Sequence, residues 1–385
     1  MKPKLIRLST IPLSMNVLLK GQLAFLNKSF EVIAVSGGGK DLSEVKEREG
    51  VRAIELKMER KISPIRDLLS LIKLYFLFLK EKPEIVHSIT PKAGLLSMLA
   101  AKFAGVPIRI HTFTGLIFPS KTGMLKKILI LMDRLLCWAA TNIYPEGHGV
   151  KNDLIKYKIT QKSLNVIANG NVNGIDIAHF SPQQVSEEVK QQLKQDLNIQ
   201  DTDFVFVFVF VGRLVGDKGI NELVAAFKQL DVENTKLLLV GAEERNLDPL
   251  KEDTIYEIEN NKNIIAVGYQ TDVRPYFAIA DALVFPSYRE GFPNVVMQAG
   301  AMGLPSIVSD INGCNEIIIE GKNGWIIPPK NVEELYLAMR RMMEDKKAYL
   351  DLKTQSRQMI VDRYQQQVVW EALLQEYKQL LNGIN

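Results

Sequence analysis

Short apolar runs rich in β-branched residues alternate with longer helical patterns along almost the whole of the 385-residue chain. Consecutive parallel strands need a crossover, usually a helix, so this order predicts parallel strands with helices on both faces of a sheet. In the first half we expect strands at Leu5–Leu8, Glu31–Val35, Val51–Leu56, Glu84–Ser88, Pro107–His111, Thr141–Tyr144 and Leu164–Ile167. The chain is therefore predicted to be an α/β protein whose ligands gather at the carboxyl ends of its strands.

The alternation is interrupted at the Asn-, Gly- and Pro-rich segment 169–182, which we interpret as a linker. The pattern restarts at Phe204–Val211, an FVFVFVFV run that is apolar on both faces and therefore predicts a buried central strand. Further strands are expected at Lys236–Val240, Ile264–Val267, Ala282–Phe285 and Ser306–Val308. The second half is thus predicted to be another parallel α/β domain with its own core.

The net charge of +4 conceals an asymmetry between the two halves. Residues 1–180 contain 27 Lys and Arg against 14 Asp and Glu, whereas the remaining residues contain 21 against 30. A basic domain attracts anionic lipid, phosphorylated substrates or nucleic acid. Because no nucleic-acid-binding motif accompanies the charge, we expect an anionic membrane surface or a phosphorylated substrate and no nucleic acid.

Other features of the sequence narrow the class of protein further. The amino end, MKPKLIRLST, does not read as an export leader, and no run reaches the roughly 18 apolar residues of a membrane span, so we expect a cytoplasmic location. The cysteines, Cys137 and Cys314, are far apart in apolar or helical surroundings. They predict reduced thiols, with neither a disulfide framework nor a metal site.

Two predicted helices of the first half are both apolar and basic. The patterns are Asp67–Lys80, and Lys121–Trp138 with Lys126, Lys127 and Arg134 beside large apolar residues. Each helix suits a membrane interface with its cations at the headgroups, and each suits a buried position against a sheet. We favour burial for the first helix and leave both alternatives open for the second.

The clearest candidate site is the stretch 282–305, which reads as a strand, a loop and a helix starting at Asn294. Glu290 lies just before that helix, whose free backbone N–H groups attract phosphates and other anions. A carboxylate accepts hydrogen bonds from neutral hydroxyls, so the pair suits a ligand with both a phosphate and a sugar. The alternative is a capping acid in an ordinary strand-to-helix turn.

A second candidate site follows the FVFVFVFV run, where Gly212–Gly219 brings Arg213 and Lys218 close to a helix start. A guanidinium fork and an ammonium point charge on a glycine-rich loop together predict a diphosphate clamp. The alternative is that Arg213 pairs with a surface acid and Lys218 is solvated.

Two further motifs carry weaker signals. The run Ser36–Lys40 holds three glycines, but it is neither a dinucleotide fingerprint nor a Walker loop, so we interpret it as a flexible turn. Asp201–Asp203 matches the D-x-D pattern of metal-dependent sugar transferases. Because it precedes its strand, it lies at the wrong end of a sheet for a ligand site, and we do not expect it to hold a metal.

The motifs together resemble glycosyltransferase family 4, which has the GT-B fold. The second half carries the specific ones, at Gly212–Gly219, Pro286–Asn294 and Ala299–Ser309. The first half is similar to bacterial members that build capsule, O-antigen or other lipid-linked surface polysaccharides, at Thr90–Gly94, His111–Gly115 and Asn169–Phe180. The resemblance implies two Rossmann-like domains whose parallel sheets face a central cleft. It assigns residues 1–180 to the acceptor, residues 181–364 to the nucleotide sugar, and residues 365–385 to a helix that crosses back.

The resemblance implies roles for individual residues. Arg213 and Lys218 would hold the diphosphate of a UDP-sugar, Glu290 would contact the sugar hydroxyls, and His111 would lie at a strand end near the sugar and acceptor. These four are the catalytic candidates. The other donor-side candidates are Gly212, Val267, Gly268, Tyr269, Gly291, Phe292, Pro293, Asn294, Val295 and Gln298. No cofactor and no metal are implied, because the cations and helix termini already neutralise the leaving diphosphate.

The acceptor side is less well matched by the family pattern. Its candidates are Ser14, Lys92, Thr112, Thr114 and Gly115. The sequence departs from the pattern at Gln298, where relatives commonly have a glutamate, and at Thr114, where many have a histidine. An amide still accepts a hydrogen bond from a hydroxyl but brings no charge.

Our leading hypothesis is a retaining, metal-independent glycosyltransferase. It moves a hexose or N-acetylhexosamine from a UDP-sugar to a lipid-diphosphate-linked saccharide at the inner face of the cell membrane, where the enzyme is peripherally bound. Two alternatives remain open, namely a noncatalytic nucleotide-sugar-binding protein and a GT-B enzyme that acts on a soluble sugar.

Overall fold

The computed structural model describes residues 2–59, 62–199, 205–230, 234–244 and 248–383. The chain forms two compact units, one made of Met1–Gly174 with Gln366–Asn385 and the other of Ile175–Gln365. We call them the N-terminal unit and the C-terminal unit. Asp201–Asp203 and Phe204, which were considered above, lie outside the described residues.

The N-terminal unit is built on a parallel six-stranded sheet with the order β3-β2-β1-β4-β5-β6. Its strands are β1 (Lys4–Leu8), β2 (Glu31–Ser36), β3 (Arg52–Glu55), β4 (Ile85–Ser88), β5 (Ile108–Phe113) and β6 (Asn142–Pro145). Alternate residues of one strand point to opposite faces, so Leu5 and Ile6 belong to different apolar clusters. Strand order reverses between β1 and β4, and the carboxyl ends of these strands are where such sheets bind ligands.

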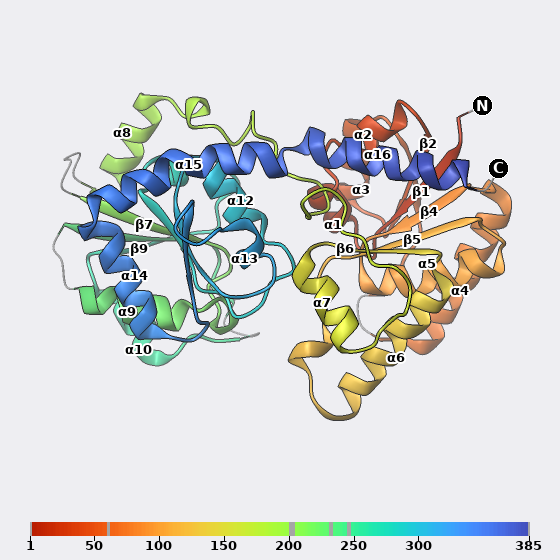
Figure 1. Cartoon of the computed structure of the whole chain (residues 1–385), viewed down its shortest axis with the longest axis horizontal. Coiled ribbons are helices and arrows are strands. Elements are labelled where there is room, and N and C mark those ends of the chain that lie inside the picture. Colours follow the sequence, from red (N-terminus) through yellow and green to blue (C-terminus); the bar gives the residue numbers. More distant parts are fainter. Residues whose placement is uncertain (1, 60–61, 200–204, 231–233, 245–247, 384–385) are drawn as a thin grey trace. The chain divides into compact units, whose positions relative to one another are not determined.

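Helices cover both faces of this sheet (Figure 1). One cluster contains side chains of α1 (Pro12–Leu18), α2 (Gln22–Asn27), α3 (Lys40–Glu49) and the C-terminal helix α16 (Gln366–Asn382). The opposite cluster contains side chains of α4 (Pro64–Glu81), α5 (Pro91–Phe103), α6 (Gly123–Ala139) and α7 (His148–Lys156). Within the second set, α5 packs against both α4 and α6.

The C-terminal unit has a second parallel six-stranded sheet, with the order β12-β11-β10-β7-β8-β9. Its strands are β7 (Phe206–Val211), β8 (Thr235–Val240), β9 (Ile264–Gly268), β10 (Ala282–Phe285), β11 (Ser306–Ser309) and β12 (Gly324–Ile327). Strand order reverses between β7 and β10. Its helices are α8 (Glu187–Asp196), α9 (Ile220–Leu230), α10 (Glu252–Asn260), α11 (Arg274–Ala278), α12 (Asn294–Ala301), α13 (Cys314–Ile317), α14 (Val332–Glu344) and α15 (Lys346–Tyr364).

One predicted strand is absent from the structure, and one observed strand was not predicted. Leu164–Ile167 is not a strand, because only Leu164 forms an isolated bridge, to Ile143. The edge strand β12 was not predicted.

The helix predicted at 67–80 covers the sheet as expected, with Leu74 and Phe78 in its core, but it is buried on one face only. Within α4 only Ser70, Leu74, Phe78 and Glu81 are buried. Ile65 is 78% exposed and Phe76 is 63% exposed. The helix is apolar on more of its circumference than the sheet can cover, so a second apolar stripe remains at the surface. Among the described helices, none is both long enough and apolar enough to cross a membrane.

Candidate active site

Both charged candidate loops of the C-terminal unit leave the sheet at the point where its strand order reverses. Gly212 and Arg213 directly follow β7, and Pro286–Pro293 follows β10, the strand paired with β7. Lys218 closes a short 3₁₀ turn, Gly216–Lys218, immediately before α9. The sheet topology thus brings together two motifs that are about 70 residues apart in sequence.

Lys218 and Glu290 form the centre of this arrangement. The Nζ atom of Lys218 donates to Oε1 of Glu290, and the hydroxyl of Ser287 donates to the same oxygen at 2.8 Å. Both charged side chains are 16% exposed, so the ion pair is largely screened from bulk water but still reachable. A partly exposed ammonium and an anchored carboxylate suit a ligand with both anionic groups and hydroxyls.

Glycines allow the two loops to approach each other closely. Gly219 has φ +73°, and a Cβ atom there would lie 2.1 Å from the carbonyl oxygen of Pro286. The backbone N–H of Tyr288 also donates to the carbonyl of Asp217 at 2.9 Å. A side chain at Gly219 would therefore separate Lys218 from Glu290.

Arg213 lies at the surface of the same edge. It is 48% exposed and donates from Nη1 to Oε2 of Glu244 at 2.8 Å. The surface pairing considered for Arg213 therefore occurs in this structure, whereas Lys218 is paired rather than solvated. An exposed pair of this kind contributes little to stability and exchanges partners readily.

The remaining donor-side candidates lie at the carboxyl ends of β9 and β10, at the same edge of the sheet. The backbone N–H of Gly241, after β8, donates to the carbonyl of Gly268 at 2.9 Å, which brings the ends of β8 and β9 together. Val267 and Gly268 end β9, and Tyr269 is 73% exposed beside them. The candidates after β10 are Gly291, Phe292 and Pro293 in the loop, and Asn294, Val295 and Gln298 in α12.

Phe292 and Cys314 are buried at the Glu290 loop. The Phe292 ring is 6% exposed and meets the Tyr364 ring edge-on at 5.5 Å. Burial raises the pKa of the Cys314 thiol well above its usual value, and the Glu290 carboxylate adds to the increase. Cys314 is therefore a neutral packing group beside the ion pair. No cluster of three or more His, Cys, Asp and Glu side chains suited to a metal occurs among the described residues.

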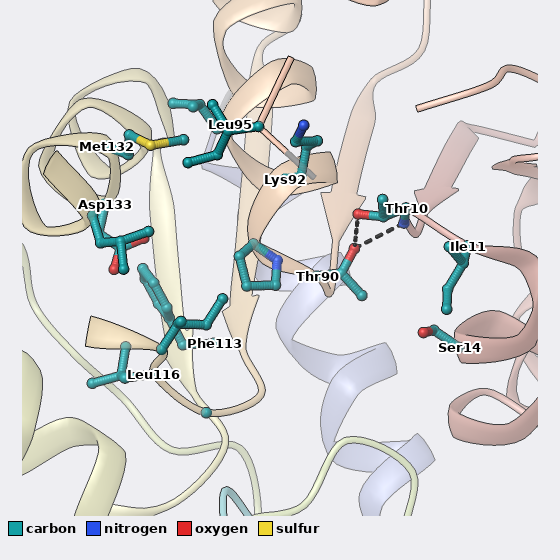
Figure 2. A pocket seen from close by; sticks show the side chains of 15 residues that line it. Thr10, Ile11, Ser14, Thr90, Lys92, Leu95, Phe113, Leu116, Met132 and Asp133 are labelled. Atoms are coloured by element: carbon teal, nitrogen blue, oxygen red, sulfur yellow. Dashed lines mark hydrogen bonds between the residues drawn. The ribbon is translucent and has the colours of Figure 1, made fainter. Parts of the chain in front are cut away.

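In the N-terminal unit the corresponding place is a cavity of about 290 Å³ (Figure 2). It opens beside the carboxyl ends of β1, β4 and β5. Thr10, Thr90 and Ser14 lie on one side, and the hydroxyls of the two threonines are 2.8 Å apart. Most other lining residues are apolar: Ile11, Ile62, Pro91, Leu95, Phe113, Leu116, Ile117, Leu129 and Met132.

Of the acceptor-side candidates, Ser14, Lys92 and Gly115 line this cavity. The Lys92 ammonium donates to both carboxylate oxygens of Asp67, at 2.8 and 2.9 Å. The cavity lining does not include Thr112 or Thr114. The Thr114 hydroxyl donates to the carbonyl of Ile89 at 3.0 Å instead.

His111 lies inside the β5 strand and is 1% exposed. Its Nδ1 is 2.8 Å from the Ser88 hydroxyl, and the ring packs edge-on against Phe113. Burial lowers the pKa of His111 to about 3, so the imidazole is neutral at physiological pH. The expectation that His111 faces a ligand at a strand end is not met in this structure.

Thr112 belongs to a buried polar network. Its hydroxyl is 2.8 Å from Nε2 of His87, whose Nδ1 is 2.5 Å from the Tyr377 hydroxyl. Arg7, which is fully buried, donates to Tyr377 at 2.6 Å. Tyr377 comes from α16, so this network attaches the C-terminal helix to the N-terminal sheet.

Three residues at these sites, Ser287, Glu244 and Asp133, were not predicted from the sequence. Asp133 lines the cavity, and burial raises the pKa of its carboxyl to about 7. It makes no hydrogen bond to another residue in the described part of the chain. A lone acid among Leu, Ile and Met residues of an apolar helix is the sequence signal that could have revealed it.

Two parallel α/β units, each with a candidate site where its strand order reverses, define the GT-B class of glycosyltransferases. The chain superimposes on the Anabaena protein HepE, crystallised in complex with UDP, with a TM-score of 0.81. The overlap covers 98% of this chain and all of HepE at 16% identity, so it shows the fold alone.

The sequence comparisons identify the family. Residues 189–359 match the family model described as glycosyl transferases group 1, and residues 14–146 match the one described as glycosyl transferase 4-like. A capsular polysaccharide biosynthesis glycosyltransferase of Staphylococcus aureus is 31% identical, covering 94% of each chain. The chain belongs to this glycosyltransferase family, which confirms the predicted family and the GT-B fold class.

A second curated relative has a more specific name. It is an Escherichia coli enzyme described as a UDP-Gal:alpha-D-GlcNAc-diphosphoundecaprenol alpha-1,3-galactosyltransferase. It is 31% identical to this chain over 74% of this chain and 73% of its own length.

Proposed function

We propose that the enzyme transfers a hexose or N-acetylhexosamine from a UDP-sugar to a lipid-diphosphate-linked saccharide during the synthesis of a bacterial surface polysaccharide. The names of the S. aureus and E. coli relatives and the UDP complex of HepE support this donor and acceptor class. The observation that carries the proposal is the Lys218–Glu290 pair at the point where strand order reverses.

Binding of the donor would rearrange the ion pairs of this site. The diphosphate attracts Lys218 and competes with Glu290 for its ammonium, while Arg213 exchanges Glu244 for a phosphate oxygen. Glu290, still anchored by Ser287, is then available to accept from the hydroxyls of the sugar. The uracil base would lie along the edge toward Val267–Tyr269.

The same groups would stabilise the leaving UDP. Charge develops on the β-phosphate as the bond to the sugar breaks, and Lys218, Arg213 and the amino end of α9 neutralise it without a metal. We propose that a hydroxyl of the acceptor attacks from the face that UDP leaves and gives its proton to the departing β-phosphate oxygen, with retention of configuration at the anomeric carbon. NMR of the anomeric proton of the product tests this step directly.

We also propose that the N-terminal unit docks on the inner face of an anionic membrane. Exposed apolar residues gather on α4 and α6, among them Ile65, Leu68, Phe76, Met124 and Leu125. Exposed cations, including Lys73, Lys80 and Lys127, occur on the same helices. Apolar side chains with flanking cations are the combination that a headgroup interface binds.

A thermal-shift screen of the purified chain against UDP, GDP, ADP and their sugars tests the donor assignment. A ligand that binds only the native state must raise the melting temperature. We expect stabilisation by UDP and by one UDP-sugar, with the shift lost in Lys218→Ala. The control is Lys228→Ala, which removes an exposed lysine of α9 that is paired with Glu257.

The donor assignment is contradicted if none of the nucleotides raises the melting temperature at millimolar concentration. Stabilisation by a UDP-sugar without hydrolysis or transfer to any acceptor would instead favour the noncatalytic binding protein.

A further inference from the structure

We propose that the cavity of the N-terminal unit binds the first isoprenoid segment of the acceptor lipid, next to its diphosphate. This inference rests on the proposed function, because it names the part of the acceptor that this cavity takes. It assigns the cavity to the hydrocarbon chain and not to the saccharide.

The lining of the cavity is the first argument. The wall formed by α5 and α6 consists of Leu95, Leu129 and Met132, and the loop after β5 adds Leu116 and Ile117. Asp133 adds a carboxyl to that wall, and the hydroxyls of Thr10, Thr90 and Ser14 lie on the opposite side (Figure 2). A saccharide would leave its hydroxyls without partners along the apolar wall, which is costly, whereas a hydrocarbon chain has no such requirement.

Continuity with the surface is the second argument. Ile62 and Ile117 line the cavity and are also 55% and 46% exposed. Ile62 lies just before the exposed stripe of α4, which starts with Ile65 and Leu68. A lipid chain can therefore pass from an apolar surface into the cavity without crossing a polar rim at these residues.

The protonation of Asp133 is compatible with a hydrocarbon chain in the cavity. Its carboxyl lies in the apolar wall with no hydrogen-bonding partner in the described part of the chain, and its pKa is raised to about 7 by burial. The nearby titratable groups are the Cys137 thiol on α6, which is buried, and the Lys92–Asp67 pair, which is internally neutral. A protonated Asp133 leaves the wall uncharged.

Calorimetric titration of farnesyl diphosphate into the whole protein, saturated beforehand with UDP, tests the inference. Excess UDP fills the diphosphate site of the C-terminal unit, so the titration reports another site. Inorganic diphosphate is titrated in parallel to measure the contribution of the charge alone. We expect farnesyl diphosphate to bind and inorganic diphosphate to show no binding.

Leu129→Trp fills the cavity, and Leu131→Trp is its matched control. Both residues belong to α6, but Leu131 is 65% exposed and does not line the cavity. We expect Leu129→Trp to weaken farnesyl diphosphate binding roughly tenfold or more, as expected when the chain cannot be buried. Leu131→Trp should bind it as the wild type does.

The outcomes separate the inference from the proposed function. Equal binding of farnesyl diphosphate to both tryptophan variants, or no binding by the wild type, overturns the inference. If UDP still stabilises these proteins in the thermal-shift assay, the variants are folded and the donor assignment stands. Failure of UDP to bind any of them contradicts the proposed function instead.

Discussion

The two units share a sheet topology but place different chemistry at the position where strand order reverses. In the C-terminal unit that position holds the ion pair Lys218–Glu290, anchored by Ser287. In the N-terminal unit it holds a largely apolar cavity beside Thr10 and Thr90. The fold therefore supplies two equivalent positions, and we propose that a few loop side chains decide whether a diphosphate or a lipid is bound there.

The two positions also differ in how closely their loops pack. In the C-terminal unit, Gly219 lets the loop after β7 touch the loop after β10 at Pro286. In the N-terminal unit, the loops after β1, β4 and β5 leave a volume of about 290 Å³ between themselves and α6. Close packing fixes the direction of charged groups, whereas an open apolar volume suits a flexible chain.

The largest expected effect is on the charged position. Lys218→Ala should lower kcat by roughly a hundredfold to a thousandfold, because one preorganised contact to the developing charge is worth about 2.7–4 kcal/mol. Arg213→Ala should act in the same direction. Sugar transfer is measured at saturating donor, with Lys228→Ala as the control. Wild-type turnover in Lys218→Ala would show that the charged position of the C-terminal unit does not stabilise the leaving diphosphate.

Gly219→Ala tests whether close loop packing matters for the charged position. A Cβ atom there would collide with backbone, so the loops must separate, at a cost of about 1–3 kcal/mol. UDP affinity should fall together with the melting temperature. Gly321→Ala is the matched control, because Gly321 has a similar φ of +72° but no atom within 4 Å of the added Cβ. Equal effects of both changes would attribute the loss to backbone strain alone.

Phe76→Ser tests the apolar surface of the N-terminal unit. If the exposed ring enters a membrane interface, its loss should weaken binding to anionic vesicles severalfold and leave UDP binding unchanged. Vesicle cosedimentation at low and high salt is the measurement, and binding of the wild type should fall as salt rises. Tyr256→Ser, which removes a 65% exposed ring from α10, should change nothing. A wild type that ignores such vesicles at low salt would refute the membrane proposal.

The expected effect with the least bearing on sugar transfer is a pH dependence of stability from Asp133. Its pKa is raised from 3.8 to about 7 in the folded state, so between these values the folded chain keeps a proton that the unfolded chain has lost. The free energy of unfolding therefore falls as pH rises through this window and this contribution levels off above it. Asp133→Asn should remove that decrease, which denaturant unfolding at pH 5 and pH 8 would detect. If the free energy of unfolding falls equally in both proteins between pH 5 and pH 8, the Asp133 carboxyl is solvated in the folded state and does not cause the decrease.

The candidate donor site could be located in the sequence because its charged residues are close together within each motif. Arg213 and Lys218 lie in one glycine-rich loop, and Glu290 lies in one strand-to-helix turn. Two strand ends that the alternation places in one parallel sheet bring these loops together. The partners of the two cations in the present structure, Glu244 and Glu290, depend on side-chain packing that the pattern does not contain.

The acceptor side could not be predicted to the same depth because its residues come from separate elements. The cavity combines Thr10, Thr90, Leu116 and Asp133, and only the folded sheet brings them together. The exposure of α4 was also missed, since apolar residues on several faces of a helix do not reveal which face the sheet covers. The burial of His111 was missed for a similar reason. It depends on a residue of another element, because Gly94 lets α5 approach the His111 ring closely.

The proposed transfer of a sugar from a UDP-sugar to a lipid-linked acceptor can be measured directly. The purified chain is incubated with bacterial membranes and each of several radiolabelled UDP-sugars, and the label in the organic-extractable lipid is counted. We predict label from one UDP-sugar, lost with Lys218→Ala and retained with Lys228→Ala. Label only in water-soluble products, or equal labelling by Lys218→Ala, would contradict the account.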